Sequence, residues 1–375
     1  MILQLSLWIL FGGSIAFAVL LYTSVGYALY GYALPEGSAV KIPPSDPGAS
    51  VIVCARNEYS NLVALLPLLF EQQHPRFEVV VADDSSSDGT RTFLQEQQRL
   101  YPQLTVVTID ERLPGIQPKK YALQRAIQTA RYNRLVLTDA DCRPASVHWL
   151  AQMVSSLQRP IQVVLGYSPY FRKPGLLNKF IGYETLHTGL LYLGRALAGR
   201  PYMGVGRNLA YQKTFFEQGS GFKNHQQVVG GDDDLWVNQH ARQSNTAVVV
   251  TPETLVYSLP KTNLRDYFHQ KTRHLHTSQH YCFRDQLWLG ALSLSTVLVW
   301  LAGTLLLVLG DNWPVIVGLF LFRWLILAAV LRTAGRRLHH PINLALLPIL
   351  DFLHVIYYIA IGTRAFATTN ISWKN

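Results

Sequence analysis

Four long apolar runs constrain the fold of this chain more than any other feature. Residues 5–28 contain no charged residue, and as a helix they are long enough to cross the roughly 30 Å hydrocarbon core of a bilayer. Residues 286–310, 313–332 and 342–362 form three more such runs. The pattern predicts one N-terminal and about three C-terminal transmembrane helices.

The first run also resembles a secretory signal peptide, because "AFA" at residues 16–18 mimics a cleavage site. No Lys or Arg precedes the run, however, and it is long for the apolar part of a signal peptide, so we expect an uncleaved anchor. Short basic loops stay in the cytoplasm. The basic loop 332–341 therefore predicts a multi-pass protein of the inner (plasma) membrane with segment 29–285 in the cytoplasm.

Charge and cysteine content narrow the possible partners. Lys and Arg exceed Asp and Glu by 33 to 23, a formal net charge of +10, which indicates an anionic partner. The basic residues concentrate in juxtamembrane stretches and loops, and no nucleic-acid motif is present. We therefore expect no nucleic-acid partner and assign the charge to lipid headgroups. Three widely spaced cysteines form neither a disulfide framework nor a metal-binding spacing.

Two charged residues interrupt the C-terminal apolar runs. Arg323 lies midway along the third run of the chain and Asp351 midway along the fourth. A lone charge at that depth is costly, so the sequence predicts either a structural ion pair within the bundle or contact with an acceptor or product.

Apolar strand-like and helix-like segments alternate between residues 49 and 141. The expected strands are 50–55, 76–83, 104–110 and 134–141, with helices over 57–73, 88–101 and 119–131. This alternation is typical of an α/β domain with a parallel, doubly wound sheet. Such sheets bind ligands beyond the carboxyl ends of their strands, where this sequence places "CARNE", "ADDSSSD" and "DAD".

Asp139 and Asp141 of "DAD" end the last expected strand. Two carboxylates so close together repel each other unless a cation lies between them. Hard divalent ions are often held by one or two carboxylates together with substrate phosphates, so the motif indicates Mg²⁺ or Mn²⁺ with a bound diphosphate. For "DAD" taken alone, a solvated turn is the competing interpretation.

The surrounding motifs extend this interpretation. In order, "CARNE", "ADDSSSDGT", "PKKYALQRAI", "LTDAD", "GVGRNLAY", "GGDDDLW" and "QKTRH" resemble the family 2 glycosyltransferases with a GT-A fold. With the apolar runs, they resemble the membrane-embedded branch that includes hyaluronan, cellulose and poly-N-acetylglucosamine synthases and ceramide glucosyltransferases. The implied organisation is an anchor over 1–40, a GT-A domain (a Rossmann-like doubly wound sheet) over 41–260, an amphipathic interface helix over 261–285 and transmembrane helices over 286–375.

The resemblance implies a nucleotide-binding loop and a base-recognition pair. Ala55, Arg56 and Glu58 match the nucleotide-binding loop, although Glu58 is also explained as an acid at a helix N-terminus. Asp83 or Asp84 would accept a hydrogen bond from the uracil N–H, and we favour Asp84 over Asp83 for this role.

The resemblance also implies residues for the diphosphate and the metal. Lys119 and Lys120 begin a helix, where cations and free N–H groups suit phosphate; a solvated helix-start charge is the alternative for either lysine. Asp139 would face the nucleotide-sugar and Asp141 would ligate the ion, so both are candidate metal-site residues.

Asp232 and Asp233 are the candidates for the general base. An inverting transfer needs a carboxylate to accept the proton of the acceptor hydroxyl. In related sequences this acid lies three residues before an apolar residue, and counting back from Leu235 selects Asp232. Counting forward from "GDD" selects Asp233 instead. Gly231 stands where many relatives have Glu, so both registers remain open.

Gln270, Arg273 and His274 match a Q-x-x-R-W motif except that His replaces Trp. Arg273 would clamp the diphosphate through its forked donors. The Trp lines the acceptor end in polymerising relatives, so His274 argues against a polymer product.

The sequence thus predicts a membrane-bound inverting glycosyltransferase that moves a sugar from a cytoplasmic UDP-sugar donor to a lipid or membrane-associated glycan acceptor. The alternatives are a processive polysaccharide synthase and a non-catalytic membrane scaffold that keeps a transferase-like fold. The donor sugar and the acceptor are not specified by the motifs.

Overall fold

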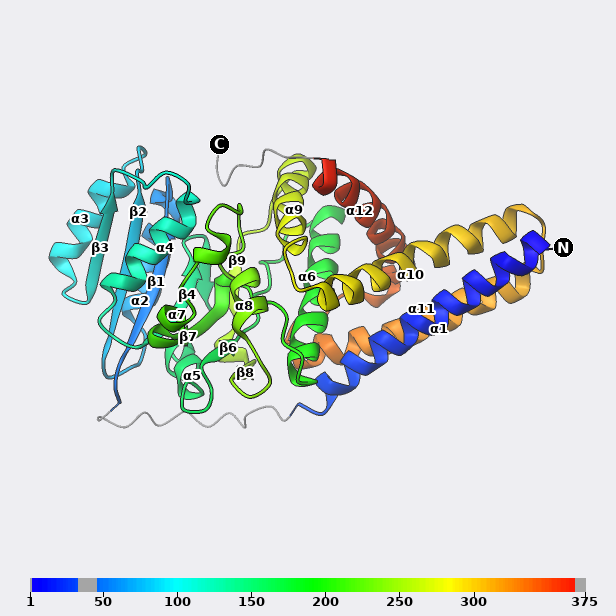
Figure 1. The fold of residues 1–375 in the computed structure, drawn as a ribbon, viewed down its shortest axis with the longest axis horizontal. Coiled ribbons are helices and arrows are strands. Elements are labelled where there is room, and N and C mark those ends of the chain that lie inside the picture. The colour runs from blue at the N-terminus through cyan, green and yellow to red at the C-terminus, as the bar shows by residue number, and fades with distance from the viewer. Residues whose placement is uncertain (1, 33–45, 368–375) are drawn as a thin grey trace. The chain divides into compact units, whose positions relative to one another are not determined.

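The computed structural model describes residues 2–32 and 46–367, and this part of the chain falls into two compact units. We call them the helical unit and the α/β unit. The helical unit is discontinuous in sequence and contains α1 (Ile2–Tyr30), α6 (Leu176–Leu197), α9 (Leu264–Ser278), α10 (Phe283–Val308), α11 (Trp313–Arg337), a short turn η4 (Leu344–Leu346) and α12 (Leu347–Ala367) (Figure 1).

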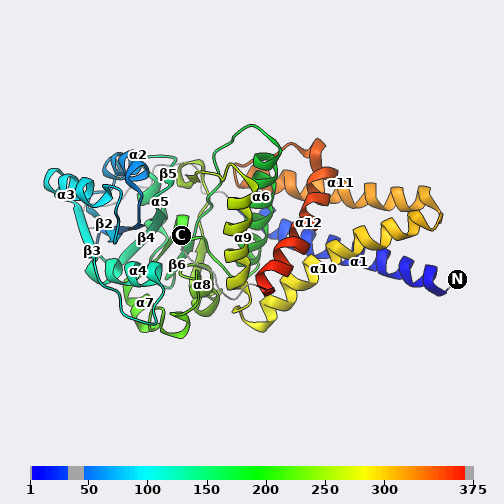
Figure 2. The same cartoon turned by 90° about the horizontal axis from the view of Figure 1, so that it is seen from above.

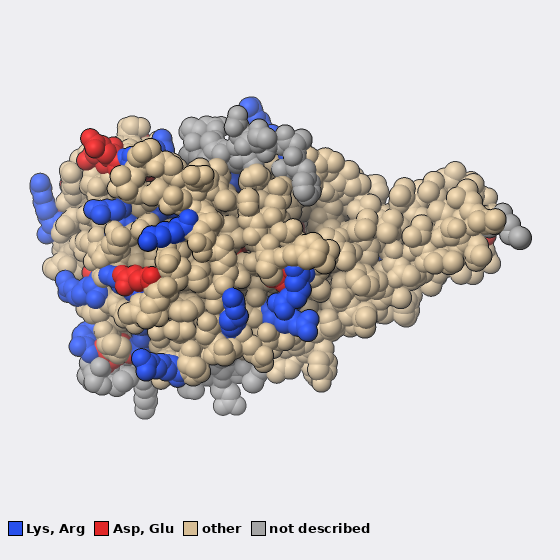
Figure 3. Space-filling model, viewed as in Figure 1, with Lys and Arg blue, Asp and Glu red and all other residues tan. Residues whose placement is uncertain are grey.

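Four helices of the helical unit are long and apolar enough to cross a membrane, as the sequence predicts: α1, α10, α11 and α12. Helices α1, α10 and α11 pack along one another through a core that includes Phe11, Val299 and Phe320. On the face drawn in Figure 3, Lys, Arg, Asp and Glu gather over the α/β unit, and this three-helix bundle is uncharged over most of its length. The distribution of charge agrees with membrane association.

The buried charged residues Arg323 of α11 and Asp351 of α12 form an ion pair. Arg323 Nη1 lies 2.6 Å from Asp351 Oδ2, and Nη2 lies 2.9 Å from Oδ1. The indole N–H groups of Trp300 and Trp324 also donate to Asp351 Oδ2, at 2.9 and 3.2 Å. Both charged side chains are almost completely buried, so the predicted structural pair is confirmed.

The α/β unit carries the sheets. Its strands are β1 (Ala49–Ala55), β2 (Phe77–Asp84), β3 (Leu104–Ile109), β4 (Arg134–Asp139), β5 (Cys142–Pro144), β6 (Val163–Leu165), β7 (Leu209–Gln212), β8 (Thr246–Val248) and β9 (Val256–Ser258). Its helices are α2 (Tyr59–Phe70), α3 (Thr90–Leu100), α4 (Pro118–Thr129), α5 (Trp149–Ser155), α7 (Lys213–Gln218) and α8 (Asp234–His240), with the short turns η1 (Gly206–Asn208), η2 (Lys223–His225) and η3 (Pro252–Thr254).

The main sheet has the order β3-β2-β1-β4-β7-β6-β8. Strands β3, β2, β1 and β4 are parallel, as the sequence predicts. The sheet also extends beyond these predicted strands: β7 runs antiparallel to both β4 and β6, and β5 pairs with β9 in a separate two-stranded sheet. The domain is therefore an α/β fold with a mixed GT-A-like sheet.

Strand β1 lies in the interior of this sheet, between β2 and β4, and both of its faces are apolar. Val51 and Val53 join the core formed with the leucines of α2, and Ile52, which alternates with them, is buried on the opposite face. Figure 2 shows α2 and α4 on opposite faces of the sheet. The chain changes face between β1 and β4, so their carboxyl ends flank a topological switch point, where such sheets bind ligands.

The predicted boundaries at 40, 260 and 285 stay predictions. The boundary at 40 lies outside the described residues, which resume at Asp46. Helix α6 falls within the range predicted for the GT-A domain but belongs to the helical unit.

Candidate active site

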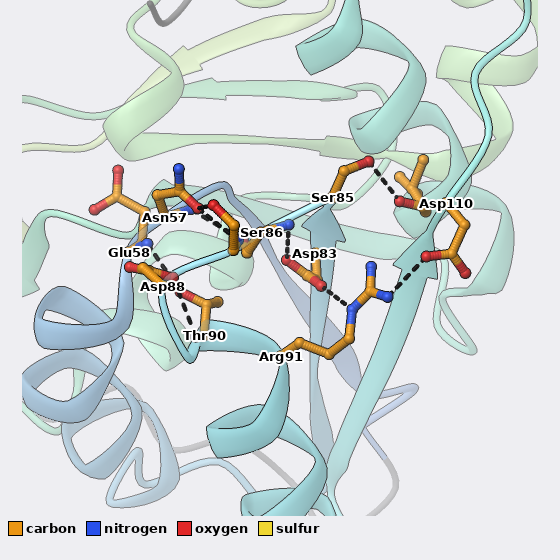
Figure 4. Close-up of polar contacts among 11 residues, drawn as sticks. Asn57, Glu58, Asp83, Ser85, Ser86, Asp88, Thr90, Arg91 and Asp110 are labelled. Atoms are coloured by element: carbon orange, nitrogen blue, oxygen red, sulfur yellow. Dashed lines mark hydrogen bonds and ion pairs between the residues drawn. The ribbon is translucent and has the colours of Figure 1, made fainter.

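The loop after β1 is held by the loop after β2. Asn57, with φ +54°, accepts a hydrogen bond from the Ser87 N–H at 2.8 Å and donates its own N–H to Ser86 Oγ at 2.9 Å. Asp88 Oδ2 accepts from the Tyr59 N–H, and its Oδ1 accepts from the Thr90 N–H at the start of α3 (Figure 4). These bonds fix the backbone between Ala55, which ends β1, and α2.

Glu58 lies immediately before α2. Its Oε2 accepts a hydrogen bond from Asn61 Nδ2 at 2.6 Å, and its backbone N–H donates to Thr90 Oγ1. Glu58 is therefore part of the same loop-to-loop network (Figure 4). A contact with the ribose or base of a nucleotide stays a prediction.

Asp83 and Asp84, both fully buried at the end of β2, have different surroundings. Asp83 accepts from Arg91 Nε at 2.9 Å and from the Ser86 N–H at 3.2 Å, so both of its oxygens are used within the loop (Figure 4). Asp84 Oδ1 accepts from Arg112 Nε at 2.8 Å, but its Oδ2 has no hydrogen-bond partner among the described residues. Arg56 lies 3.8 Å from Oδ2. Asp84 thus offers a buried charged acceptor.

Lys119 joins two acidic motifs that are far apart in sequence. Its Nζ lies 3.2 Å from Asp139 Oδ1 and 2.9 Å from Asp232 Oδ2. Burial alone would lower the pKa of Lys119, but the carboxylates of Asp139 and Asp232 raise it well above its ordinary value. The ammonium group of Lys119 therefore joins the end of β4 to the Gly230–Asp234 loop.

Lys120, the next residue, donates to backbone carbonyl oxygens. Its buried Nζ donates to the carbonyl oxygens of His225 at 2.5 Å and Val228 at 2.8 Å, and burial lowers its pKa to about 8. In this arrangement Lys120 holds the loop that precedes the three aspartates. Its predicted contact with the nucleotide remains untested.

The three aspartates of the Asp232–Asp234 run also differ from one another. Asp233 caps α8, because its Oδ1 accepts from the Asp234 N–H at 2.8 Å and its Oδ2 accepts from the Gly206 N–H at 2.6 Å. Asp232 is 4% exposed and faces Lys119. Burial alone would raise the pKa of Asp232, but Lys119 lowers it; burial and the charge of Asp232 raise the pKa of Asp233 to about 7.

Gly231 has a local reason to be glycine. Its φ is +75°, and a Cβ at this position would lie 2.9 Å from Leu235 Cβ. A glutamate at this position would therefore strain the loop. The carboxylates of this loop come from residues 232–234 alone.

Asp139 and Asp141 stay candidate ligands for a hard divalent cation. Burial and the neighbouring charge of Asp139 raise the pKa of Asp141, because two close carboxylates repel each other. Among the described residues, no group of three or more His, Cys, Asp or Glu side chains could hold a metal by itself. Mg²⁺ and Mn²⁺ sites that use one or two carboxylates and substrate phosphates have this composition.

The Q-x-x-R-H residues lie in the helical unit. Gln270, Arg273 and His274 are on α9, whose buried face includes Tyr267 and Lys271. Lys271 Nζ lies 2.5 Å from Glu184 Oε2, which joins α9 to α6 within that unit. Contact between the three residues and a donor stays a prediction.

A comparison with protein-family profiles identifies the family. The profile described as Glycosyl transferase family 21 matches residues 17–375. The chain belongs to this family. The match confirms the predicted glycosyltransferase class, of the hexosyl-transferring type, and the predicted link to the ceramide glucosyltransferase branch.

Individual curated proteins match shorter parts of the chain than the family profile does. The chain is 30% identical over 195 residues to glycosyltransferase AglE of Haloferax volcanii, covering 52% of this chain and 61% of that protein. It is 30% identical over 130 residues to a β-monoglucosyldiacylglycerol synthase of Nostoc sp., covering 34% of this chain and 27% of that protein. The matched segments thus span less than two thirds of these curated relatives.

A similar fold has been solved. The mannosyltransferase PcManGT of Pyrobaculum calidifontis, in complex with GDP-Man and Mn²⁺, superposes with a TM-score of 0.65 and 21% sequence identity, covering 98% of this chain and 99% of that one. This likeness confirms the predicted GT-A fold.

Proposed function

We propose that this member of family 21 is an inverting, metal-dependent glycosyltransferase that adds one sugar from a UDP-sugar to a lipid acceptor at the membrane. The observation that carries the proposal is the position of Lys119 between Asp139 and Asp232. An inverting transfer needs a charged donor site and a basic carboxylate close together, because one carboxylate deprotonates the acceptor while the diphosphate leaves.

Each motif has a part in this mechanism. Asp84 offers Oδ2 to the imide N–H of uracil, and Lys119 neutralises the phosphates. Asp139 and Asp141 would hold Mg²⁺ or Mn²⁺, which would stabilise the charge of the departing diphosphate. Asp232 takes the proton of the acceptor hydroxyl, and Asp233 keeps α8 and Gly206 in position.

Three observations support a lipid acceptor. The family includes a ceramide glucosyltransferase branch, the helical unit has four helices that could span a membrane, and one similar protein is a β-monoglucosyldiacylglycerol synthase. His274 in place of Trp favours a single addition over a polymer. The basic end of α11, with Arg336 and Arg337, favours a cytoplasmic α/β unit.

Nucleotide release from detergent-purified protein tests the proposal. The protein would be incubated with a panel of UDP- and GDP-sugars, Mg²⁺ or Mn²⁺, and membrane lipid extract. We expect release of UDP from one donor, stimulated by lipid and abolished by chelator. Release of GDP alone would refute the donor class. Binding without any release would favour the scaffold alternative.

A further inference from the structure

Arg207 lies beside the candidate donor site, yet the motifs assign it no role. It is the middle residue of η1, between β7 and the preceding loop, and its guanidinium carbon lies 4.4 Å from the centre of the Tyr170 ring. Asp141 and Asp139 are among the groups that act on it electrostatically. Arg207 therefore lies at the same end of the sheet as the "DAD" carboxylates.

The backbone on both sides of Arg207 is held firmly. The Gly206 N–H donates to Asp233 Oδ2 at 2.6 Å, which ties the turn to the base loop. Asn208 is fully buried; its Nδ2 donates to the carbonyls of Tyr167 and Thr254, and its Oδ1 accepts from Trp149 Nε1. The backbone position of Arg207 is thus set by the fold.

The cation of Arg207 has no anionic partner at close range. No carboxylate of the described residues lies within 4.0 Å of its nitrogens, and its Nη1 is buried without a hydrogen-bond partner. A guanidinium stays charged at all physiological pH values, and burying one of its donors without an acceptor is costly. Such an arrangement is suited to an anion supplied by a ligand.

We propose that Arg207 binds the diphosphate of the donor beside Asp139 and Asp141 and stabilises the nucleoside diphosphate as it leaves. The inference rests on the proposed function. In the transfer, the bond between the acceptor oxygen and C1 of the sugar forms, and the bond between C1 and the diphosphate oxygen breaks. The electron pair stays on the diphosphate, next to Arg207, and the acceptor proton goes to Asp232.

Binding of UDP and of uridine to the full-length protein with Mn²⁺ tests the proposal. Because a hydrogen bond to a charged group is strong, Arg207→Gln should weaken UDP binding about 10- to 100-fold and leave uridine binding within about threefold. Arg207→Lys keeps the charge but loses the forked pair of N–H donors. Its UDP affinity should therefore lie between those of the wild type and of Arg207→Gln. Turnover should fall in the same order.

Arg242→Gln is the matched control. It removes the same charge from the α/β unit, but Arg242 is exposed and donates to the carbonyls of Ala241 and Gln239. Its UDP affinity and turnover should equal those of the wild type. If Arg207→Gln fails to fold, the comparison of Arg207→Lys with the wild type carries the test.

The possible outcomes separate the two proposals. If the wild type binds UDP and the Arg207 variants match it in affinity and turnover, the inference about Arg207 is wrong and the proposed function stands. Equal losses of UDP and uridine binding would show a structural role and also overturn the inference. If the wild type binds GDP instead, the same comparison is made with GDP and guanosine. Binding of neither nucleotide overturns both proposals.

Discussion

The exchange of Asp232 for Asn tests the assignment of the base with the least disturbance to the site. The substitution keeps the shape of a side chain that is 4% exposed, and it removes the carboxylate 2.9 Å from Lys119. A positioned general base contributes about 10²- to 10⁴-fold to rate, equivalent to roughly 3–5 kcal/mol of transition-state free energy. We expect kcat to fall by that factor.

Donor binding should respond differently. Lys119 keeps its contact with Asp139 in the Asp232→Asn variant, and the predicted metal ligands are unchanged. Because the base acts on the acceptor proton, UDP affinity should stay within about threefold of the wild type, a change of less than 1 kcal/mol.

Asp233→Asn is the matched comparison. Both oxygens of Asp233 accept backbone N–H groups, and burial together with the charge of Asp232 raises its pKa to about 7. Asn is a good N-cap but can accept only one of these bonds through its single oxygen, so we expect about 1–2 kcal/mol lower stability. Turnover should fall less than tenfold.

The assay is nucleotide release at saturating donor and acceptor, with UDP affinity and thermal unfolding measured on the same preparations. A large loss of kcat in Asp233→Asn with near-normal turnover in Asp232→Asn would refute the assignment. Parallel losses of UDP affinity and kcat in Asp232→Asn would instead make Asp232 a donor-binding residue.

Three further predictions concern the nucleobase, acid stability and the bundle. Asp84→Ala should lower UDP affinity about tenfold or more by removing a charged acceptor, whereas Asp83→Ala should leave it within about threefold; equal effects in a binding titration would contradict this. Burial lowers the pKa of His225 to about 4, so its stabilising contribution is complete above pH 6.5 and is lost as the pH falls towards 4, by at most about 3 kcal/mol; pH-dependent unfolding of His225→Gln should lack this loss, and an unchanged profile would exclude the contribution. Asp351→Ala should destabilise the bundle by about 3–5 kcal/mol because it leaves Arg323 buried without its partner, and the double change Arg323→Met with Asp351→Leu should recover most of that loss in thermal unfolding; a double variant as unstable as the single one would contradict this.

The first half of the α/β unit could be predicted from sequence because its signals are local. Strands β1, β2 and β4 are continuous apolar runs that end in polar residues, and the helices between them have clear amphipathic spacing. The same holds for the four long apolar helices. Each segment carries its own pattern, so no tertiary information was needed.

The strands after β4 could not be predicted in the same way. Strands β6, β8 and β9 have three residues each, too short for a period to emerge, and their pairing depends on long-range contacts. Helix α6 mixes apolar residues with Glu184, His187 and Arg195, so its sequence resembles neither a membrane span nor a surface helix. Its membership of the helical unit is a property of the folded chain.

The candidate site, like the fold, was predictable from the sequence only where the signal is local. The residue types at the strand ends predicted acidic and cationic groups, but the contact of Lys119 with both Asp139 and Asp232 joins segments separated by about a hundred residues. Lys119 and Lys120 are adjacent in sequence, yet one faces carboxylates and the other faces backbone carbonyls. Arg207 was missed because the lack of a nearby carboxylate is visible only in three dimensions; the only sequence signal was its place in "GVGRNLAY".

Transfer of a radiolabelled sugar into lipid tests the central claim most directly. Purified protein would be incubated with membrane lipid extract, Mn²⁺ and each UDP-sugar in turn, and the organic phase would be separated by chromatography. We predict one discrete labelled lipid from one donor, absent with chelator and with the Asp232→Asn variant. Label that remains outside the organic phase as a polymer, or no transfer from any UDP-sugar by folded protein, would contradict the account.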